Sequence, residues 1–344
     1  MEASISDVAR AANVSVSTVS RSFTRPSAVA PSTREKVLGI AKELDFSISR
    51  SAAMLKSGRS MRIALLMSGD LRLWFSASVV EGLNQIFHPQ GYDLLIFQIS
   101  SINERREFFE TLPVRRNADA VIVISLGIDQ KEVAKLLNIG VPIVGINCDS
   151  PEETGFTAAV NIDDDQGSIL AARHLLNLGH RNLVYLRTSR AVSLHFSVQR
   201  RYESFMKCCA DNGVSPLTIT TDGTADGISR IVSKLSALAE FPSAVACQED
   251  AIAVPLLFRL TQSGYQVPSA LSLIGYDDGL YAQDVGLTTI RQRPLDLAHH
   301  AALMTLDLIH GKRPGAHPFQ VIPAELVLRA TTARFASAMA GRQH

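Results

Sequence analysis

The sequence predicts a small all-α module followed by a larger α/β body that contains two doubly wound parallel sheets. Residues 4–44 carry helix start signals and apolar stripes with helical period. From residue 62 onward, short apolar runs alternate with helical patterns at the spacing of crossover helices, which is typical of βαβ units. An apolar content of 46% in 344 residues, with 19% charged residues, is enough for this module and two medium-sized domains.

The first predicted helix begins near Ile5. Ser4 and Asp7 form a capping-box-like start, because the serine oxygen can accept an otherwise unpaired amide of the first turn. Apolar residues then recur at i, i+3, i+4 and i+7 from Ile5 to Ala12, so that one stripe of this helix faces a small core.

A second helix follows a short turn. Ser15 can cap it, and Val19 and Phe23 lie one turn apart on its inner side. This arrangement leaves Ser17 and Arg21 on the outer side, where they are free to contact a partner.

A third helix is expected at residues 31–44. Pro31 suits its first turn, and one apolar stripe is formed by Val37, Ile40, Ala41 and Leu44. Three such helices with an outward Ser/Thr/Arg face are typical of a helix-turn-helix module, whose second helix enters the DNA major groove. The alternative is a solvated helical hairpin made of the first two helices alone. These two helices carry too few apolar side chains for a core of their own and need the third helix to complete one.

The overall charge of +1 hides an asymmetry between the two parts of the chain. Residues 1–62 contain 10 Lys and Arg against 5 Asp and Glu, a net charge of +5, whereas the remainder contains 24 against 28, a net charge of −4. Positive charge concentrated on the helical module favours attraction to phosphates.

Seven strands are expected in the body, at residues 63–67, 94–99, 120–124, 142–146, 182–186, 243–247 and 271–276. Ligands of such sheets bind at the carboxyl ends of the strands, in the cleft between lobes. No G-x-G-x-x-G or Walker-type loop follows any of these strands, which argues against a nucleotide-dependent enzyme.

Catalysis, metal binding and cofactors are not expected. Neighbouring side chains in Asp163-Asp164-Asp165 and His299-His300 point apart, whereas metal ligands must converge. The four cysteines form no C-x-x-C pair and suit packing better than redox chemistry. Because no apolar run approaches a membrane span and no secretory signal is present, a cytoplasmic protein is expected.

Four motifs resemble one known family. The stretch ISDVARAANVSVSTVSR (5–21), together with HLLNLGHRNLVYL (174–186), LSLIGYDD (271–278) and LTTIRQ (287–292), is similar to the signatures of the lac repressor/galactose repressor family of bacterial transcription regulators. The resemblance implies a helix-turn-helix headpiece at 1–46, a hinge at 47–61 and a two-lobed periplasmic-binding-protein-like body. It places the N-terminal lobe at 62–160 and 291–320, the C-terminal lobe at 161–290 and 321–335, and a tail at 336–344.

The resemblance also implies two sets of binding residues. In the headpiece, the residues that would meet base edges or phosphates are Ser15, Val16, Ser17, Thr18, Ser20 and Arg21. In the hinge, Leu55 would wedge into the minor groove. In the body, the residues that would surround an effector are Trp74, Phe75, Asn147, Arg201, Glu249 and Asp277.

Several positions depart from the family pattern. Ala30 replaces a capping serine before the third helix, Glu249 replaces an asparagine, Asn147 replaces an aspartate, and Leu73-Trp74 replaces Asn-Pro. The last three departures fall in the implied pocket and indicate an unusual effector.

The function implied is that of a homodimeric repressor of carbohydrate genes, which binds pseudo-palindromic operator DNA and is released by a small sugar-like effector. Two alternatives remain open. One is a regulator of the same family that needs its ligand as co-repressor or acts as an activator. The other is a solute-binding protein that shares only the two-lobed body.

Overall fold

The computed structural model describes residues 3–24, 28–46, 59–68, 70–111, 114, 117–189 and 196–335. The chain divides into two compact units, Met1–Met61 and Arg62–His344. Most of the predicted hinge, residues 47–58, and the predicted tail, residues 336–344, lie outside the described residues. Within the described ranges, no helix is long and apolar enough to cross a membrane.

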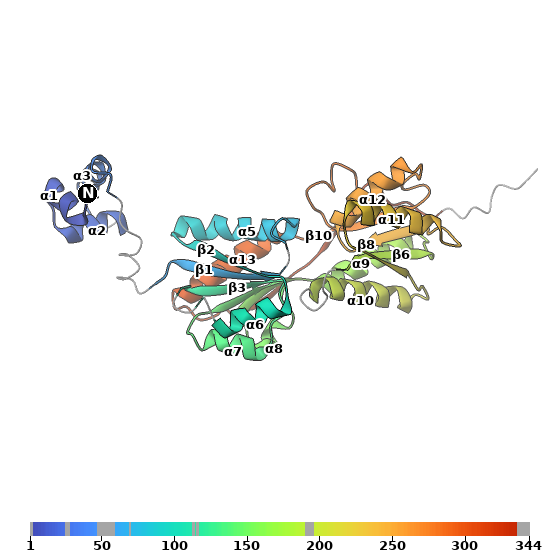
Figure 1. Ribbon diagram of the computed structural model, residues 1–344, viewed down its shortest axis with the longest axis horizontal. Coiled ribbons are helices and arrows are strands. Elements are labelled where there is room, and N and C mark those ends of the chain that lie inside the picture. The colour runs from blue at the N-terminus through green and yellow to red at the C-terminus, as the bar shows by residue number, and fades with distance from the viewer. Residues whose placement is uncertain are drawn as a thin grey trace, which may run out of the picture. The chain divides into compact units, whose positions relative to one another are not determined.

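Over its described residues, the N-terminal unit contains the α-helices α1 (Ile5–Ala12), α2 (Val16–Thr24) and α3 (Pro31–Glu43) (Figure 1). Each helix contributes one apolar stripe to a small shared core, as the sequence predicts. The buried members of this core are Val8, Ala9, Ala12, Val19, Val37 and Ala41.

Side-chain caps fix the starts of α1 and α2. The predicted capping box is present, since Ser4 Oγ accepts from the Asp7 amide and the Asp7 carboxylate accepts from the Ser4 amide at 3.0 Å. Ser15 Oγ accepts from the Thr18 amide at 3.1 Å. These bonds satisfy amides that have no partner within the first turn of each helix.

The third helix differs from expectation at its C-terminal end. Leu44 was placed on the apolar stripe, but it is the C-cap residue and is 38% exposed. The helical period no longer holds where the helix ends, and Phe46 instead packs edge-on against Phe23, with ring centroids 6.2 Å apart. At the N-terminal end, Ala30 provides no side-chain cap, as its departure from the family pattern implies.

The first sheet of the larger unit has the strand order β11-β5-β4-β3-β1-β2, and all of its pairs are parallel. Its strands are β1 (Arg62–Ser68), β2 (Asp93–Ile99), β3 (Ala120–Ile124), β4 (Ile143–Ile146), β5 (Ala158–Ile162) and β11 (Phe319–Ile322). The central strands β1, β3 and β4 are almost wholly buried, which explains their continuous apolar sequences.

The second sheet has the order β12-β10-β9-β8-β6-β7. Its strands are β6 (Leu183–Thr188), β7 (Leu217–Thr221), β8 (Ala244–Cys247), β9 (Ser272–Asp277), β10 (Thr288–Arg291) and β12 (Glu325–Val327). The pairs of β6 with β7, β6 with β8, β8 with β9 and β9 with β10 are parallel, as predicted, and the edge strand β12 pairs antiparallel with β10. The chain runs directly from β11 of the first sheet into β12. Among the described residues, no helix lies between these two strands to return the chain and allow parallel pairing.

Helices cover both faces of each sheet (Figure 1). On the first sheet, α5 (Trp74–Phe87) and α13 (Pro294–Ile309) cover one face. The other face carries α6 (Ile102–Thr111), α7 (Gln130–Leu137) and α8 (Pro151–Thr154), and a 3-10 turn, η2 (His88–Gln90), follows α5. On the second sheet, α11 (Ala225–Ser236) and α12 (Asp250–Gln262) lie opposite α9 (Asp164–Asn177) and α10 (Phe196–Asp211).

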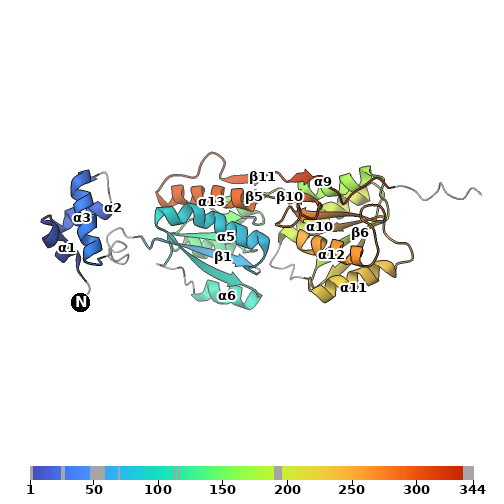
Figure 2. The ribbon, with the colours of Figure 1, turned by 90° about the horizontal axis from the view of Figure 1, so that it is seen from above.

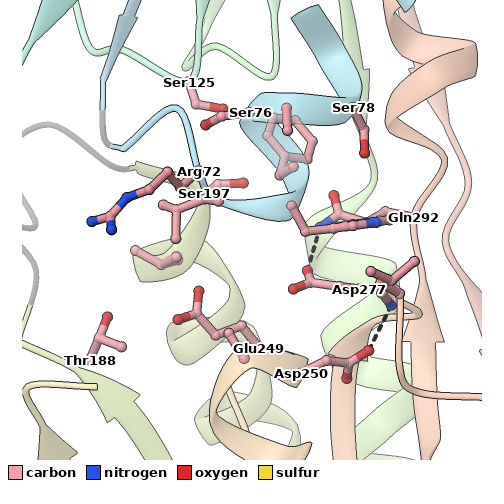
Figure 3. A pocket seen from close by; sticks show the side chains of 18 of the residues that line it. Arg72, Ser76, Ser78, Ser125, Thr188, Ser197, Glu249, Asp250, Asp277 and Gln292 are labelled. Carbon is pink, nitrogen blue, oxygen red and sulfur yellow. Dashed lines mark hydrogen bonds between the residues drawn. The ribbon is translucent and has the colours of Figure 1, made fainter. Parts of the chain in front are cut away.

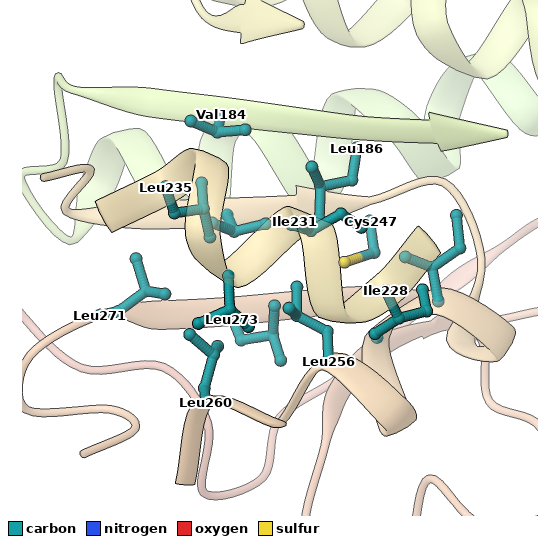
Figure 4. Close-up of a cluster of buried hydrophobic side chains, with 14 of the residues drawn as sticks. Val184, Leu186, Ile228, Ile231, Leu235, Cys247, Leu256, Leu260, Leu271 and Leu273 are labelled. Carbon is teal, nitrogen blue, oxygen red and sulfur yellow. The ribbon is translucent and has the colours of Figure 1, made fainter. Parts of the chain in front are cut away.

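The core of the second sheet shows why these layers hold together (Figure 4). Val184, Leu186 and Leu273 project from the strands against Ile231 of α11 and Leu256 of α12, and each of these side chains is almost fully buried. Burial of apolar side chains of this size stabilises a fold by about 1.5–3 kcal/mol each.

The chain passes between the two sheets three times along the described residues, from β5 to α9, from β10 to α13 and from β11 to β12 (Figure 2). Both sheets begin with the same order, in which the first strand lies between the second and the third. In such sheets the carboxyl ends of the strands form the ligand crevice. The fold therefore places polar residues that follow β1, β3, β4, β6, β8 and β9 around a common space.

Close packing of α5 on α13 generates the first prediction. A Cβ atom at Gly82 would lie 2.7 Å from Ala298 Cβ and 3.2 Å from the Leu295 carbonyl oxygen. Overpacking costs about 1–3 kcal/mol, which exceeds the roughly 1 kcal/mol gained from helix propensity. We therefore expect Gly82→Ala to lower the free energy of unfolding in denaturant titrations. Gly315→Ala is the matched control, since no atom lies within 4 Å of its added Cβ, and an equal loss in both variants would contradict the packing argument.

Candidate DNA-binding surface and interlobe cavity

The outer face of α2 is the candidate DNA-binding surface. Ser15, Val16, Ser17 and Arg21 are exposed, whereas Thr18 and Ser20 are half-buried. The opposite face carries Val19 and Ser22, which are fully buried. All six headpiece residues selected from the sequence thus lie on or beside the solvent-facing side of one helix.

Hydrogen bonds hold the start of this surface in place. Ser15 Oγ lies 2.8 Å from Ser17 Oγ and 2.9 Å from Thr18 Oγ1, so the three hydroxyl groups form one polar cluster at the N-terminus of α2. Helix N-termini favour phosphate groups. At the far end of α2, Arg34 Nε donates to the Ser22 carbonyl at 3.1 Å, which ties α3 to the second helix.

Leu55, the predicted minor-groove wedge, lies outside the described residues.

The body contains a cavity of about 610 Å³ whose lining residues come from both lobes (Figure 3). Ser68 and Ser125 reach it from the ends of strands of the first sheet, and Thr188 does so from the second. The six body residues selected from the sequence all line it: Trp74, Phe75, Asn147, Arg201, Glu249 and Asp277. The structure thus brings together residues that are up to about 200 positions apart in the chain.

Arg201 of α10 is the central cation of the cavity floor. It is 5% exposed, its Nε donates to Asp164 Oδ1 at 2.7 Å, and its Nη1 donates to Asp277 Oδ1 at 3.5 Å. Its guanidinium carbon lies 3.9 Å from the centroid of the Tyr276 ring. Although burial favours the neutral form, the neighbouring Asp164 carboxylate raises the pKa of Arg201 above its ordinary value, so this side chain stays charged.

Asp277 lies at the end of β9, in a backbone conformation with φ of 129°. Its Oδ1 atom also accepts from Gln292 Nε2 at 2.5 Å (Figure 3). Burial raises the pKa of Asp277 well above its usual range, Arg201 opposes this shift, and Asp250 and Glu249 add to it. A non-glycine residue with positive φ at a cavity is a form of strain that is often found at binding sites.

Asn147 lines the cavity, but both polar atoms of its side-chain amide form hydrogen bonds with other groups of the protein. Its Nδ2 donates to Ser197 Oγ at 2.8 Å, and its Oδ1 accepts from the Ile162 amide at 3.3 Å. Ser197 Oγ in turn donates to Asp164 through a short contact. Asn147 follows a strand of the first sheet and Ser197 belongs to α10, so this bond links the two lobes.

The remaining predicted residues form the other walls. Trp74 and Phe75 open α5 and are half-buried. Glu249 stands at the N-cap position of α12 without making a side-chain cap, and its carboxylate is directed into the cavity (Figure 3).

Several residues of this site are not among those selected from the sequence, and Asp164, Ser197 and Gln292 are three of them. Asp164 was noted only as part of an aspartate run, and Gln292 only as the last letter of a motif. Among the described residues, no group of three or more His, Cys, Asp or Glu side chains converges as metal ligands would. Asp163 caps α9 by accepting from the Gln166 amide at 2.9 Å, while Asp164 points inward to Arg201.

The buried ion pair generates a stability prediction. Arg201→Ala would leave Asp164 and Asp277 without their counter-ion, and breaking a buried pair in this way costs about 3–5 kcal/mol. We expect a clear fall in the urea midpoint of the full chain. Lys207→Ala on the same helix is the control, because its ion pair with Asp211 is exposed and screened by water. Similar midpoints for the two variants would contradict the assigned role of Arg201.

Two family models match parts of the chain. The model of the lacI family of bacterial regulatory proteins matches residues 4–49, and that of the periplasmic binding protein-like domain matches residues 172–332. The HTH-type transcriptional repressor PurR of Vibrio cholerae strain M66-2 is 29% identical over 340 residues, covering 96% of this chain and 98% of the relative. PurR of Photobacterium profundum is 28% identical over 336 residues, covering 95% and 98%.

Solved structures share the whole fold. The lac repressor dimer bound to operator and the anti-inducer ONPF has a TM-score of 0.80 at 23% identity, covering 97% of this chain and 100% of that one. The complex of the transcriptional regulator CelR with cellobiose has a TM-score of 0.66 at 24% identity, covering 96% and 99%. The three-helix unit, the two α/β lobes and the full-length similarity lead to one conclusion: the chain belongs to the LacI family of bacterial regulatory proteins and is a DNA-binding transcription regulator with a periplasmic-binding-protein-like body.

Proposed function

We propose that this regulator is a homodimeric repressor that leaves its operator when a small, sugar-like effector binds in the interlobe cavity. The observation that carries the proposal is the cavity itself, because its polar floor connects both lobes through side chains that a ligand would contact. The match of residues 4–49 to a DNA-binding regulator family argues against the alternative of a solute-binding protein.

Charge and exposure support the DNA-binding half of the proposal. Residues 1–62 carry a net charge of +5, and a dimer has two copies of this positive segment. A dimer also matches the symmetry of a pseudo-palindromic site. Val16, Ser17 and Arg21 would meet base edges, since they are exposed on the outer face of α2. Ser15, Thr18 and Ser20 would lie nearer the phosphates.

The geometry of the cavity supports the effector half. A volume of about 610 Å³ suits a small molecule. Asp277 and Arg201 would hold its polar groups, while Trp74 and Phe75 would pack against its apolar face, as aromatic side chains do in sugar and ring-binding sites.

Coupling between the two halves would be mechanical. An effector that prefers one angle between the lobes would alter the hinge at residues 47–61, and Leu55 would then lose or gain its place in the minor groove. A hundredfold change in operator affinity needs only about 2.7 kcal/mol of differential binding. One or two charge-assisted hydrogen bonds to Asp277 or Arg201 would be enough.

The ligand could instead increase operator affinity. A ligand that stabilises the DNA-binding state would act as a co-repressor, and the same cavity could hold an inducer or a co-repressor. Titration of operator binding with ligands found in a thermal-shift screen of sugars and sugar derivatives decides between them. Weaker operator binding supports release by the effector, and tighter binding supports a co-repressor.

The DNA-binding surface generates a specificity prediction. Arg21→Ala should reduce discrimination between a duplex selected from a random library and a scrambled duplex by about 1–3 kcal/mol, as expected when a base-edge contact is lost. Arg10→Ala, which removes the same charge from α1, should weaken both duplexes equally. Equal losses for Arg21→Ala on the two duplexes would show that Arg21 contacts phosphate instead.

The cavity generates a response prediction. Asp277→Asn should bind operator like the wild type and respond to the screened ligand only at much higher concentration, because Arg201 keeps its 2.7 Å partner Asp164 while the ligand loses a carboxylate. Asp277→Asn is therefore a cleaner test than Arg201→Ala, which also removes a buried charge. The control is Asp284→Asn, an exposed position outside the cavity lining. A wild-type response in Asp277→Asn would contradict the proposed site.

A further inference from the structure

The polar groups of the cavity floor are mainly acceptors of hydrogen bonds. Arg201 and Gln292 both donate to the Oδ1 atom of the Asp277 carboxylate. Gln292 is 4% exposed and lines the cavity, and its Oε1 atom is buried without a hydrogen-bond partner among the described residues. A buried acceptor without a donor is destabilising, so the floor favours a ligand that brings donors.

The charges of the lining are unbalanced. Among the described residues that line the cavity, four carboxylates (Glu81, Glu249, Asp250 and Asp277) face two guanidinium groups (Arg72 and Arg201). The Arg72 side chain is 91% exposed and lies 3.6 Å from Asp70, so water and a carboxylate screen its charge.

Arg201 does not correct this imbalance. Its single positive charge is shared by the carboxylates of Asp164 and Asp277, and one face of its guanidinium group lies on the Tyr276 ring. An anionic ligand would have to displace a buried carboxylate to reach it, which costs more than a new ion pair returns. The floor therefore disfavours phosphates and carboxylates.

Burial raises the pKa values of two carboxyl groups in the floor. It raises the pKa of Asp250 to about 6, even though the Gly279 amide and the Thr289 hydroxyl donate to it. Burial also raises the pKa of Asp277, Arg201 opposes this shift, and Asp250 and Glu249 add to it. A positive group placed among these carboxylates would relieve their mutual repulsion.

An aromatic ring lies beside the carboxylates. The position of a Cβ atom on Gly279 would be 3.7 Å from Trp74 Cδ2 and 3.9 Å from Asp250 Oδ2. The Trp74 indole of α5 and the Asp250 carboxylate of α12 therefore both lie close to Gly279. Indole faces attract cations, so carboxylate and ring act in the same sense.

We propose that the effector carries a positively charged nitrogen, which sits among Asp277, Glu249 and the Trp74 ring and donates to Gln292 Oε1. This inference rests on the proposed effector function of the cavity and specifies the chemical class of its ligand. The effector is an amine or amidine on a compact ring, and neutral or acidic analogues of the same ring bind more weakly.

The test uses three sets of ligands that share a ring and differ in charge. They are glucosamine, glucose and glucuronate; galactosamine, galactose and galacturonate; and benzylamine, benzyl alcohol and benzoate. Affinities for the full chain are measured by calorimetry at pH 7. We expect the amine of at least one set to bind about tenfold tighter than its neutral counterpart, with the acid weakest. The inference is overturned if no amine binds, or if no amine binds tighter than its neutral counterpart.

Two variants locate the effect. Glu249→Gln keeps the size and shape of the side chain and removes its charge, so it should fold normally and lose most of the preference for the amine. Glu240→Gln, which removes an exposed charge outside the cavity, should keep that preference. An unchanged preference in Glu249→Gln would overturn the inference.

A third variant separates this inference from the proposed function. If neutral ligands bind best and lose affinity in Trp74→Ala, the charge assignment is wrong while effector binding in the cavity stands. If ligands that change operator binding are insensitive to both Trp74→Ala and Glu249→Gln, the proposed effector site is wrong, and the inference falls with it.

Discussion

The ion pair between Arg201 and Asp164 is the interaction on which the rest of the site depends. At 2.7 Å, with both side chains almost fully buried, it joins α10 to α9 beneath the cavity. Because Arg201 is held there, it can also reach Asp277, and because Asp164 is held there, it can accept from Ser197 and Tyr276. A buried charge without these partners would be unstable, so the floor is a single polar unit rather than a set of separate contacts.

The position of this unit follows from the topology of the sheets. Each lobe places its first strand between the second and third, so the loops after β1, β3, β6 and β8 separate and leave a crevice. Residues at the carboxyl ends of the strands need not pack in a core, and positive φ occurs at Ser125 after β3, at Asn147 after β4 and at Asp277 at the end of β9. Strain at these strand ends is tolerated because buried strands on both sides fix the backbone.

Much of this could be predicted from the sequence where the signal is local. Capping by Ser4, the apolar stripes of α1 to α3 and the seven apolar strands all lie within short windows, and the structure contains them. Strands β5, β7, β10, β11 and β12 were missed, because polar residues interrupt their apolar runs, as Asn does in AAVNI and Thr in LTITT, and they become strands through their neighbours. Asp164 was missed for a related reason, since its partner Arg201 lies 37 positions away. The family resemblance predicted residues that line the cavity, which hydrophobic periodicity alone could not do. It did not predict the hydrogen bonds that Asn147 forms.

Asn147 shows how the site and the lobes are connected. A family aspartate at this position would add another negative charge beside Asp164, whereas the amide donates to Ser197 and so completes a chain of contacts from Asn147 through Asp164 and Arg201 to Asp277. This chain of contacts begins in one lobe and ends at the cavity-lining carboxylate of the other. Under the proposed function, a ligand that drew Asp277 away from Arg201 would change the hydrogen bonding of Asp164 and Ser197, and through Ser197 the one step of this chain that crosses between the lobes. With asparagine at position 147, that step is a neutral, directional hydrogen bond, and the carboxylates of this chain all belong to the second lobe.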